Sequence, residues 1–292
     1  MRFLAIGEAM LELSEQSPLW ALNVAGDTFN TAWHVKRLLG DTAEVEYLSV
    51  LGTDPFSDRI ARFMAASGIG TRFLRRDPGR GPGLYAISLQ DGERSFTYWR
   101  DRSAARLLAD DPEHLAAALD WAGTIYFSGI TLAILTPEAR ARLLSALETA
   151  HAAGRRLIFD PNLRPRLWED APTMRATITR AAGLADVLLP SFEDEAQHFG
   201  DADLAACARR YGADAGRDVV VKNGGQDVLL AVDGARTLWP LDTVTPVDTT
   251  GAGDAFNAGW IAARHRGLDA DASLAAAHDL ARHVVSIQGA LG

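Results

Sequence analysis

Short apolar runs alternate with amphipathic stretches along almost the whole chain, and this alternation constrains the fold more than any single motif does. The runs are apolar without interruption, as in strands that are buried on both faces. Strands are predicted at 3–6, 45–51, 124–127, 157–159, 187–189 and 219–221, and helices at 29–39, 57–67, 137–153 and 254–266. Such a repeat predicts an α/β protein with a mainly parallel sheet and helices on both faces.

Two hairpins interrupt the alternation. Strand-forming runs at 83–90 and 94–100 flank Asp91-Gly92, a favourable hairpin turn. This hairpin is predicted to belong to a small β-lid, formed by about 10–24 and 70–102 and inserted in a single domain spanning 1–292. A second hairpin around Asp233-Gly234 is predicted to extend one edge of the main sheet. Near the start of the chain, Asp27 is placed to cap the helix at 29–39, and Gly40 is placed to end it.

The composition excludes several classes of protein. With 29 basic and 38 acidic residues the net charge is −9, which disfavours nonspecific binding to nucleic acid. The single cysteine, Cys207, cannot form an internal disulfide. No run approaches 18 uninterrupted apolar residues, and Met1 leads directly into a predicted strand, so neither a membrane span nor a targeting segment is expected. These features are typical of a cytoplasmic enzyme.

The most specific segment lies near the C-terminus and runs Asp248-Thr-Thr-Gly251-Ala252-Gly253-Asp254-Ala-Phe-Asn-Ala-Gly259. Its glycines allow backbone N–H groups to converge, and the helix that begins nearby adds its positive dipole end. Gly251, Ala252 and Gly253 therefore predict an anion hole suited to phosphate. Asp254 is then best interpreted as a general base that takes a proton from an attacking hydroxyl. The alternative is a tight turn in which Asp254 only caps a helix.

Other common phosphate and catalytic motifs are missing. The chain has no Gly-x-x-x-x-Gly-Lys-Ser/Thr segment, which disfavours P-loop chemistry. Gly251-Ala252-Gly253 lacks the third glycine of a dinucleotide-binding fingerprint and does not follow the first strand. The seven histidines show no metal-ligand spacing, and no nucleophile elbow is present.

The segment 248–259 resembles the signature of the PfkB (ribokinase-like) carbohydrate kinases, and 26–32 resembles the N-terminal sugar-binding signature of that family. Segments 83–85, 96–100, 128–135 and 159–168 resemble the family's 2-keto-3-deoxygluconate kinases. The resemblance implies a ribokinase-like fold. It also implies ATP-dependent phosphorylation of 2-keto-3-deoxygluconate to 2-keto-3-deoxy-6-phosphogluconate, with Asp254 as the base.

A carboxylate distinguishes this substrate from neutral sugars. In an acidic protein, such a substrate requires a local cation, preferably arginine, whose planar fork matches a carboxylate. By the resemblance, Arg100 and Arg164 read that group, whereas Arg102 and Arg166 are expected to be solvated. Tyr85 and Tyr98 either contact the sugar or pack in the lid. Gly26, Asp27 and Asn30 are expected to face the sugar, with helix capping as the alternative for Asp27.

The resemblance also implies where ATP and its metal bind. The path of the nucleotide and its phosphates is expected along Asn162, Ser191, Lys222, Gly224, Gly225 and Gly253. Several of these residues follow predicted strands at the edge where α/β proteins bind ligands. Mg²⁺ is expected on the phosphates, supported through water by Asp194 or Glu195. Dependence on a monovalent cation is left open.

The chain departs from the family pattern at three places. At 191–195 the asparagine that the family often carries is absent, which is why either acidic residue could support the metal. Ala25 stands where the family commonly has glycine. The tail after the last helix is short, so contacts to adenine from that helix are expected to be altered.

Two other functions fit parts of the sequence. One is a neutral-sugar kinase of the same family, such as a fructokinase, and the other is a non-catalytic sugar-acid-binding protein on the same fold. The sequence does not distinguish the gluconate-derived substrate from its galactonate epimer. The aromatic lid suggests that the chain forms a homo-oligomer through it.

Overall fold

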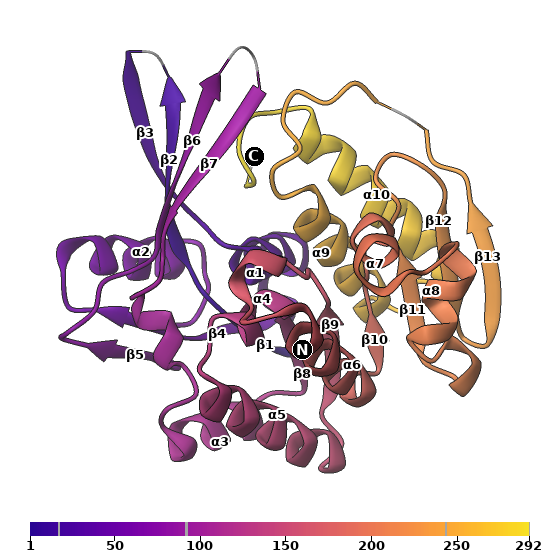
Figure 1. Cartoon of the computed structure of the whole chain (residues 1–292), viewed down its shortest axis with the longest axis horizontal. Helices are drawn as coiled ribbons and strands as arrows, with labels where there is room; N and C mark the ends of the chain where they lie inside the picture. Colours follow the sequence, from indigo (N-terminus) through magenta and orange to yellow (C-terminus); the bar gives the residue numbers. More distant parts are fainter. Residues whose placement is uncertain (17, 91–92, 243, 292) are drawn as a thin grey trace.

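The computed structural model describes residues 1–16, 18–90, 93–242 and 244–291. A nine-stranded sheet crosses the molecule in the order β13-β12-β11-β10-β9-β8-β1-β4-β5, and a separate four-stranded sheet projects from this body (Figure 1). The large sheet consists of β1 (Arg2–Ile6), β4 (Glu44–Gly52), β5 (Leu74–Asp77), β8 (Thr124–Ser128), β9 (Arg156–Asp160), β10 (Val187–Leu188), β11 (Asp218–Val221), β12 (Val228–Val232) and β13 (Ala235–Trp239). All neighbours pair in parallel except β11 with β12 and β12 with β13.

Helices cover both faces of this sheet because its strands are apolar on both sides. In β1, Phe3 and Ala5 join one buried cluster, and Leu4 and Ile6 join the other. The first cluster includes residues of α1 (Asp27–Leu39), α2 (Pro55–Ala66), α9 (Ala252–His265) and α10 (Ala270–Val285). The second includes residues of α3 (Pro112–Trp121), α5 (Pro137–Ala152), α6 (Ala171–Leu184) and α8 (Leu204–Arg210). The predicted α/β class with helices on both faces is confirmed.

Local sequence sets where many of these helices begin. Asp54 and Asp111 accept hydrogen bonds from backbone N–H groups of the first turns of α2 and α3, and each is followed by proline. The predicted cap at Asp27 is wrong, because α1 begins at Asp27 itself and Gly26 precedes it. Gly26 has φ +150°, and a Cβ there would collide with the carbonyl of Glu8, so glycine is required. The Asp27 carboxylate is therefore free for contacts across the fold.

The small sheet has the order β3-β2-β6-β7, with β2 (Met10–Gln16), β3 (Leu19–Ala25), β6 (Leu84–Gln90) and β7 (Glu93–Trp99). Both predicted strands of the first hairpin are present, and its turn at 91–92 lies outside the described residues. The predicted lid range of 70–102 is too long, because β5 pairs with β4 in the large sheet. The hairpin of β12 and β13 extends the large sheet at its edge, as predicted.

The strand order creates a switch point between β1 and β8. From β1 the chain continues to β4 on one side, and from β8 it continues through β9 and β10 to β11 on the other. Crevices form at such points, outside the carboxyl ends of the strands. Two short helices begin at this edge, α4 (Gly129–Ala133) after β8 and α7 (Phe192–Phe199) after β10. Within the part of the chain that the structure describes, no helix has the length and apolar character needed to cross a membrane.

Candidate active site

Two cavities lie at the carboxyl edge of the sheet and share a wall. The larger, of about 640 Å³, lies between this edge and the small sheet, and the second, of about 350 Å³, lies beside α9 and α10. The residues that line both are Ser191, Lys222, Thr249, Ala252 and Gly253. The predicted anion hole therefore lies at the junction of the two cavities, where a group can pass from a ligand in one to a ligand in the other.

The start of α9 forms this junction. Gly251 precedes the helix with φ +77°, and a Cβ at this position would collide with Ala290. The N–H groups of the first helical turn have no acceptor within the helix, so Gly253 and Asp254 present donors at its positive end. The Ala252 N–H already donates to the Thr249 carbonyl at 3.3 Å. The backbone N–H groups of Gly253 and Asp254 are therefore better placed than that of Ala252 to bind an anion.

Asp254 lines the larger cavity, at the start of α9. Its Oδ2 accepts a hydrogen bond from Asn30 Nδ2 at 2.8 Å, which orients the carboxylate. Burial raises the pKa of Asp254 well above its ordinary value, and the negative charge of Asp27 raises it further. A carboxylate with a raised pKa is a stronger base when ionised, as a proton acceptor from a hydroxyl requires.

Asn30 and Asp27, which were predicted to face the sugar, also make hydrogen bonds within the protein. Both line the larger cavity, but Asn30 uses its amide to join Asp254 to the backbone, since its Oδ1 also accepts from the Gly26 N–H at 3.3 Å. Asp27 Oδ2 accepts from Ser128 Oγ at 2.5 Å and from Asn162 Nδ2 at 3.1 Å. Burial raises the pKa of Asp27 as well. Asn30 is therefore bonded directly to Asp254, and Asp27 lies in the same cavity wall.

The two arginines predicted to read a carboxylate both line the larger cavity but differ in their partners. Arg100 is buried, and its Nη2 donates to the buried carboxylate of Glu8. Arg164 has a side chain that is 56% exposed, and its Nη1 lies 3.7 Å from Asp194 Oδ2. It also has a left-handed backbone, with φ +43°, a strained conformation that is frequent at functional sites. Arg164 is thus the less firmly paired of the two.

Tyr85 and Tyr98 pair across β6 and β7, and both line the larger cavity. Their ring centroids are 5.7 Å apart, and the Tyr85 hydroxyl donates to Glu12 within the small sheet. The Tyr98 side chain is exposed. Tyr85 therefore packs in the small sheet and also borders the cavity, and its contact with the sugar stays a prediction.

Two acidic residues of this site were missed by the sequence analysis. Glu8 follows β1, and Asp160 ends β9, so both lie at the carboxyl edge and line the larger cavity. The rule that ligands bind beyond the carboxyl ends of parallel strands could have identified them. Neither lies in a glycine-rich motif, and their partners, Arg100 and Lys222, are distant in sequence.

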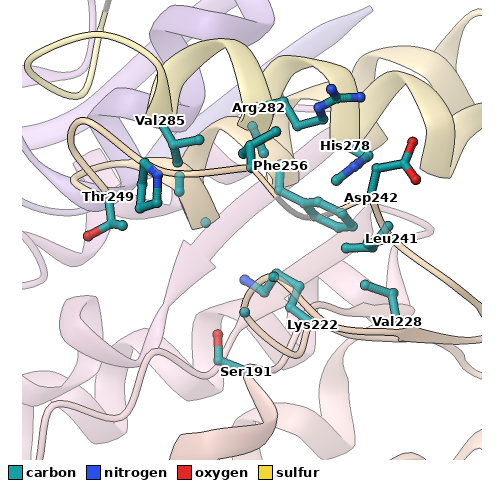
Figure 2. A pocket seen from close by; sticks show the side chains of 17 residues that line it. Ser191, Lys222, Val228, Leu241, Asp242, Thr249, Phe256, His278, Arg282 and Val285 are labelled. Atoms are coloured by element: carbon teal, nitrogen blue, oxygen red, sulfur yellow. The ribbon is translucent and has the colours of Figure 1, made fainter.

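The second cavity has mainly apolar walls, among them Val228, Phe256 and Val285. Figure 2 shows Ser191, Lys222 and Val228 on one side of it, and Phe256, His278 and Val285 from α9 and α10 on the other. The predicted residues Gly224 and Gly225 line this cavity, whereas Asn162 lines the larger one. Such a cavity suits a flat heterocycle with phosphates directed toward Gly253.

The two residues predicted to support a metal have different surroundings. Asp194 lines the larger cavity, and its pKa is raised by burial and lowered in part by Arg164. Glu195 is buried away from this cavity, and its carboxylate accepts a hydrogen bond from Arg210 Nη2 at 2.7 Å. Of the two residues, Asp194 alone is among those that line the larger cavity, and its support of a metal stays a prediction. Among the described residues, no group of three or more His, Cys, Asp or Glu side chains is placed to hold a metal ion.

Glu195 provides a test of stability against pH. Burial raises its pKa from 4.5 to about 7 in the folded state, so the folded protein binds more protons than the unfolded chain between these values. Its ionisation therefore lowers the unfolding free energy as pH rises through this range, by up to about 3 kcal/mol. Glu195→Gln should become more stable relative to wild type as pH rises, since Asp201 still pairs with Arg210. Urea unfolding at several pH values measures this difference, and a difference independent of pH would contradict it.

Several known proteins are similar to this chain in sequence or in fold. Residues 4–291 match the family profile described as "pfkB family carbohydrate kinase". The 2-dehydro-3-deoxygluconokinase of Dickeya dadantii (strain 3937) is 35% identical over 296 residues, which cover 98% of this chain and 95% of that protein. The fructokinase of Vibrio alginolyticus is 30% identical over 265 residues, covering 90% and 84%. The crystal structure of fructokinase with bound ATP from Xylella fastidiosa has a TM-score of 0.83 and 25% identity, covering 99% and 94%. These similarities confirm the family resemblance and the fold expected from the sequence.

Proposed function

The chain belongs to the pfkB family of carbohydrate kinases, and from this membership we propose that it phosphorylates 2-keto-3-deoxygluconate with ATP. This acid is also called 2-dehydro-3-deoxygluconate, the substrate in the name of the Dickeya dadantii relative. The product is 2-keto-3-deoxy-6-phosphogluconate. The observation that carries the proposal is the wall shared by the two cavities, with Asp254 beside it in the larger one.

In the proposed reaction the sugar acid occupies the larger cavity and ATP the second. The terminal hydroxyl lies beside Asp254 and transfers its proton to the carboxylate while its oxygen attacks the γ-phosphorus. The bond from that phosphorus to the β–γ bridging oxygen breaks, and ADP leaves with the electron pair. Donors at Gly253 and Asp254 stabilise the charge on the transferring group, which is the main work of a phosphoryl-transfer site.

The metal of this reaction is expected to be Mg²⁺, which keeps several waters and binds mainly to the phosphates. Glu8, Asp27 and Asp160 also line the larger cavity, but each accepts hydrogen bonds from other side chains of the protein. Asp254 is the proposed base, which leaves Asp194 as the carboxylate that fits such a weakly protein-bound ion. We therefore propose that Asp194 supports it through water. When bound, the ion neutralises phosphate charge. Dependence on a monovalent cation is tested by replacing potassium with lithium in the assay.

The acidic substrate is favoured over a neutral sugar by the two arginines of the larger cavity. Charge-assisted bonds to a carboxylate are each worth about 1.5–3 kcal/mol, and a neutral sugar cannot make them. The neutral-sugar alternative draws on the fructokinase relative, which is 30% identical. The greater identity and coverage of the 2-dehydro-3-deoxygluconokinase relative support the acid.

The test is ADP release with Mg-ATP and a panel of sugars. The panel contains 2-keto-3-deoxygluconate, its galactonate epimer, gluconate and fructose. We expect the highest kcat/KM with 2-keto-3-deoxygluconate. Faster turnover of fructose would establish the neutral-sugar alternative, and no turnover of any sugar would favour the non-catalytic one.

We also propose that two copies associate through the small sheet. Tyr85 and Tyr98 lie on its cavity face, and the alternation of side chains places Trp20 and Trp99 on the other. Trp20 is 48% and Trp99 56% exposed, which is a large apolar area for a free surface. Light scattering should give a mass above one chain, and Trp99→Glu should reduce it.

A further inference from the structure

The chain carries only two lysines among its 29 basic residues, and one of them, Lys222, lies in the wall shared by the two cavities. The Lys222 residue is 8% exposed, whereas lysines are almost never buried unless they are paired. A lysine presents a compact point charge, whereas an arginine presents a wider, planar guanidinium.

Two buried side chains hold this ammonium, and a third supports one of them. Its Nζ donates to Asp160 Oδ2 at 3.2 Å and to Asn257 Oδ1 at 3.0 Å. Asn257 Nδ2 in turn donates to the same Asp160 oxygen at 2.6 Å and to the Tyr126 hydroxyl at 3.0 Å. Asn257 has no exposed surface and Asp160 is 4% exposed, so the arrangement is shielded from water. The flexible lysine side chain is thereby restricted to one position.

The ammonium faces the start of α9. A Cβ built on Gly253 would have Lys222 Nζ as its nearest neighbour, at 3.8 Å. An ammonium has three N–H donors, and two of them are used by Asp160 and Asn257. The third is left for a group lying between Lys222 and the first turn of α9, which is the position of the transferring phosphoryl group in the proposed reaction.

We propose that Lys222 is a catalytic residue that stabilises the charge on the transferring phosphoryl group, and that Asp160 and Asn257 are positioning residues for it. This proposal rests on the proposed kinase function. In the transition state, negative charge is spread over the equatorial oxygens of that group. A fixed cation stabilises this state more than the ground state, so its loss is expected in kcat rather than in KM.

Lys222→Met should lower kcat about 100-fold or more, the loss typical of one preorganised donor, with the KM for the sugar acid changed less than about threefold. Asn257→Ala should lower kcat about tenfold, because Lys222 loses one of its two anchors. In the variant that combines Lys222→Met with Asn257→Ala, the Asn257 substitution should lower kcat no further. The reason is that a positioning residue acts only through Lys222. A merely structural role for Asn257 would lower kcat equally in both backgrounds and would contradict the proposal. Thermal unfolding identifies a variant that fails to fold.

A second measurement needs no sugar. Protein labelled with ¹³C at the lysine ε-carbons should give two lysine resonances. The substitution Lys36→Arg removes one of them and so assigns both, and Lys36 is not among the residues that line the two cavities. ADP with Mg²⁺ and aluminium fluoride, which mimics the transferring group, should shift the Lys222 resonance more than ADP with Mg²⁺ alone. An unshifted resonance, or a kcat of Lys222→Met within threefold of wild type, would overturn the proposal.

These outcomes are separable from failure of the proposed substrate. If fructose replaces the sugar acid, the same variants are measured with fructose, and the same pattern is expected. If no sugar is turned over, the proposed function fails, while the resonance shift still decides whether Lys222 meets the phosphoryl mimic.

Discussion

Asp254→Asn should lower kcat by about 100-fold or more, since a positioned general base contributes about 10²–10⁴-fold. The substitution preserves the shape of the side chain, and its carbonyl oxygen can still accept from Asn30 Nδ2, which lies 2.8 Å from Asp254 Oδ2 in the wild type. What it removes is the ability to take a proton. The dissociation constants of ATP and of the sugar acid, measured by calorimetry, should therefore change less than about threefold.

The pH dependence of the same variant provides a control. Because burial and Asp27 raise the pKa of Asp254, the carboxylate becomes protonated at a higher pH than an ordinary aspartate does. The kcat of the wild type should therefore fall as pH decreases, and this acid limb should be absent from the residual activity of Asp254→Asn. The pKa of Asp27 is raised too, and its charge acts on Asp254. The apparent pKa of this fall in kcat therefore belongs to the two carboxyls together. A variant with kcat within tenfold of wild type and the same acid limb would remove Asp254 from the mechanism.

The second large effect is expected at Arg164. Arg164→Met should reduce the preference for 2-keto-3-deoxygluconate over fructose, measured as the ratio of kcat/KM values, by about 10- to 100-fold, the value of one charge-assisted hydrogen bond. Arg164 is a sharper test than Arg100. Removal of Arg100 would leave Glu8 as a buried, uncompensated charge and would destabilise the fold itself.

Arg166→Met is the matched control for this experiment. Arg166 is exposed, lies two residues away and is absent from the residues that line the larger cavity. Arg166→Met should leave the preference for 2-keto-3-deoxygluconate over fructose unchanged within about twofold, since surface substitutions away from a site have small effects. Equal losses in both variants would mean that the general charge of this loop, rather than a contact from Arg164, attracts the acid.

Parts of the fold that depend on local pattern could be predicted from the sequence. The strands are apolar on both faces because helices cover both sides, and this property is visible in the chain itself, as at Phe3 to Ile6. The glycines at 251 and 253 and the acidic residue that follows them also predict an anion site from local sequence alone. The first hairpin was recognised, but the lid boundary at 70 was wrong, because nothing local shows that Leu74–Asp77 pairs with β4.

Contacts across the sheet were decided by the tertiary structure alone. Asn30 and Asp254 are 224 positions apart, and Asp160 and Asn257 are 97 apart, so no spacing in the chain predicts that they meet. The different surroundings of Asp194 and Glu195 were decided in the same way. Successive residues of a helix point about 100° apart, so α7 directs Asp194 to the cavity and Glu195 into the core beside Arg210. Periodicity determines which segments form strands and helices, whereas the strand order and the orientation of each helix determine which charges come together.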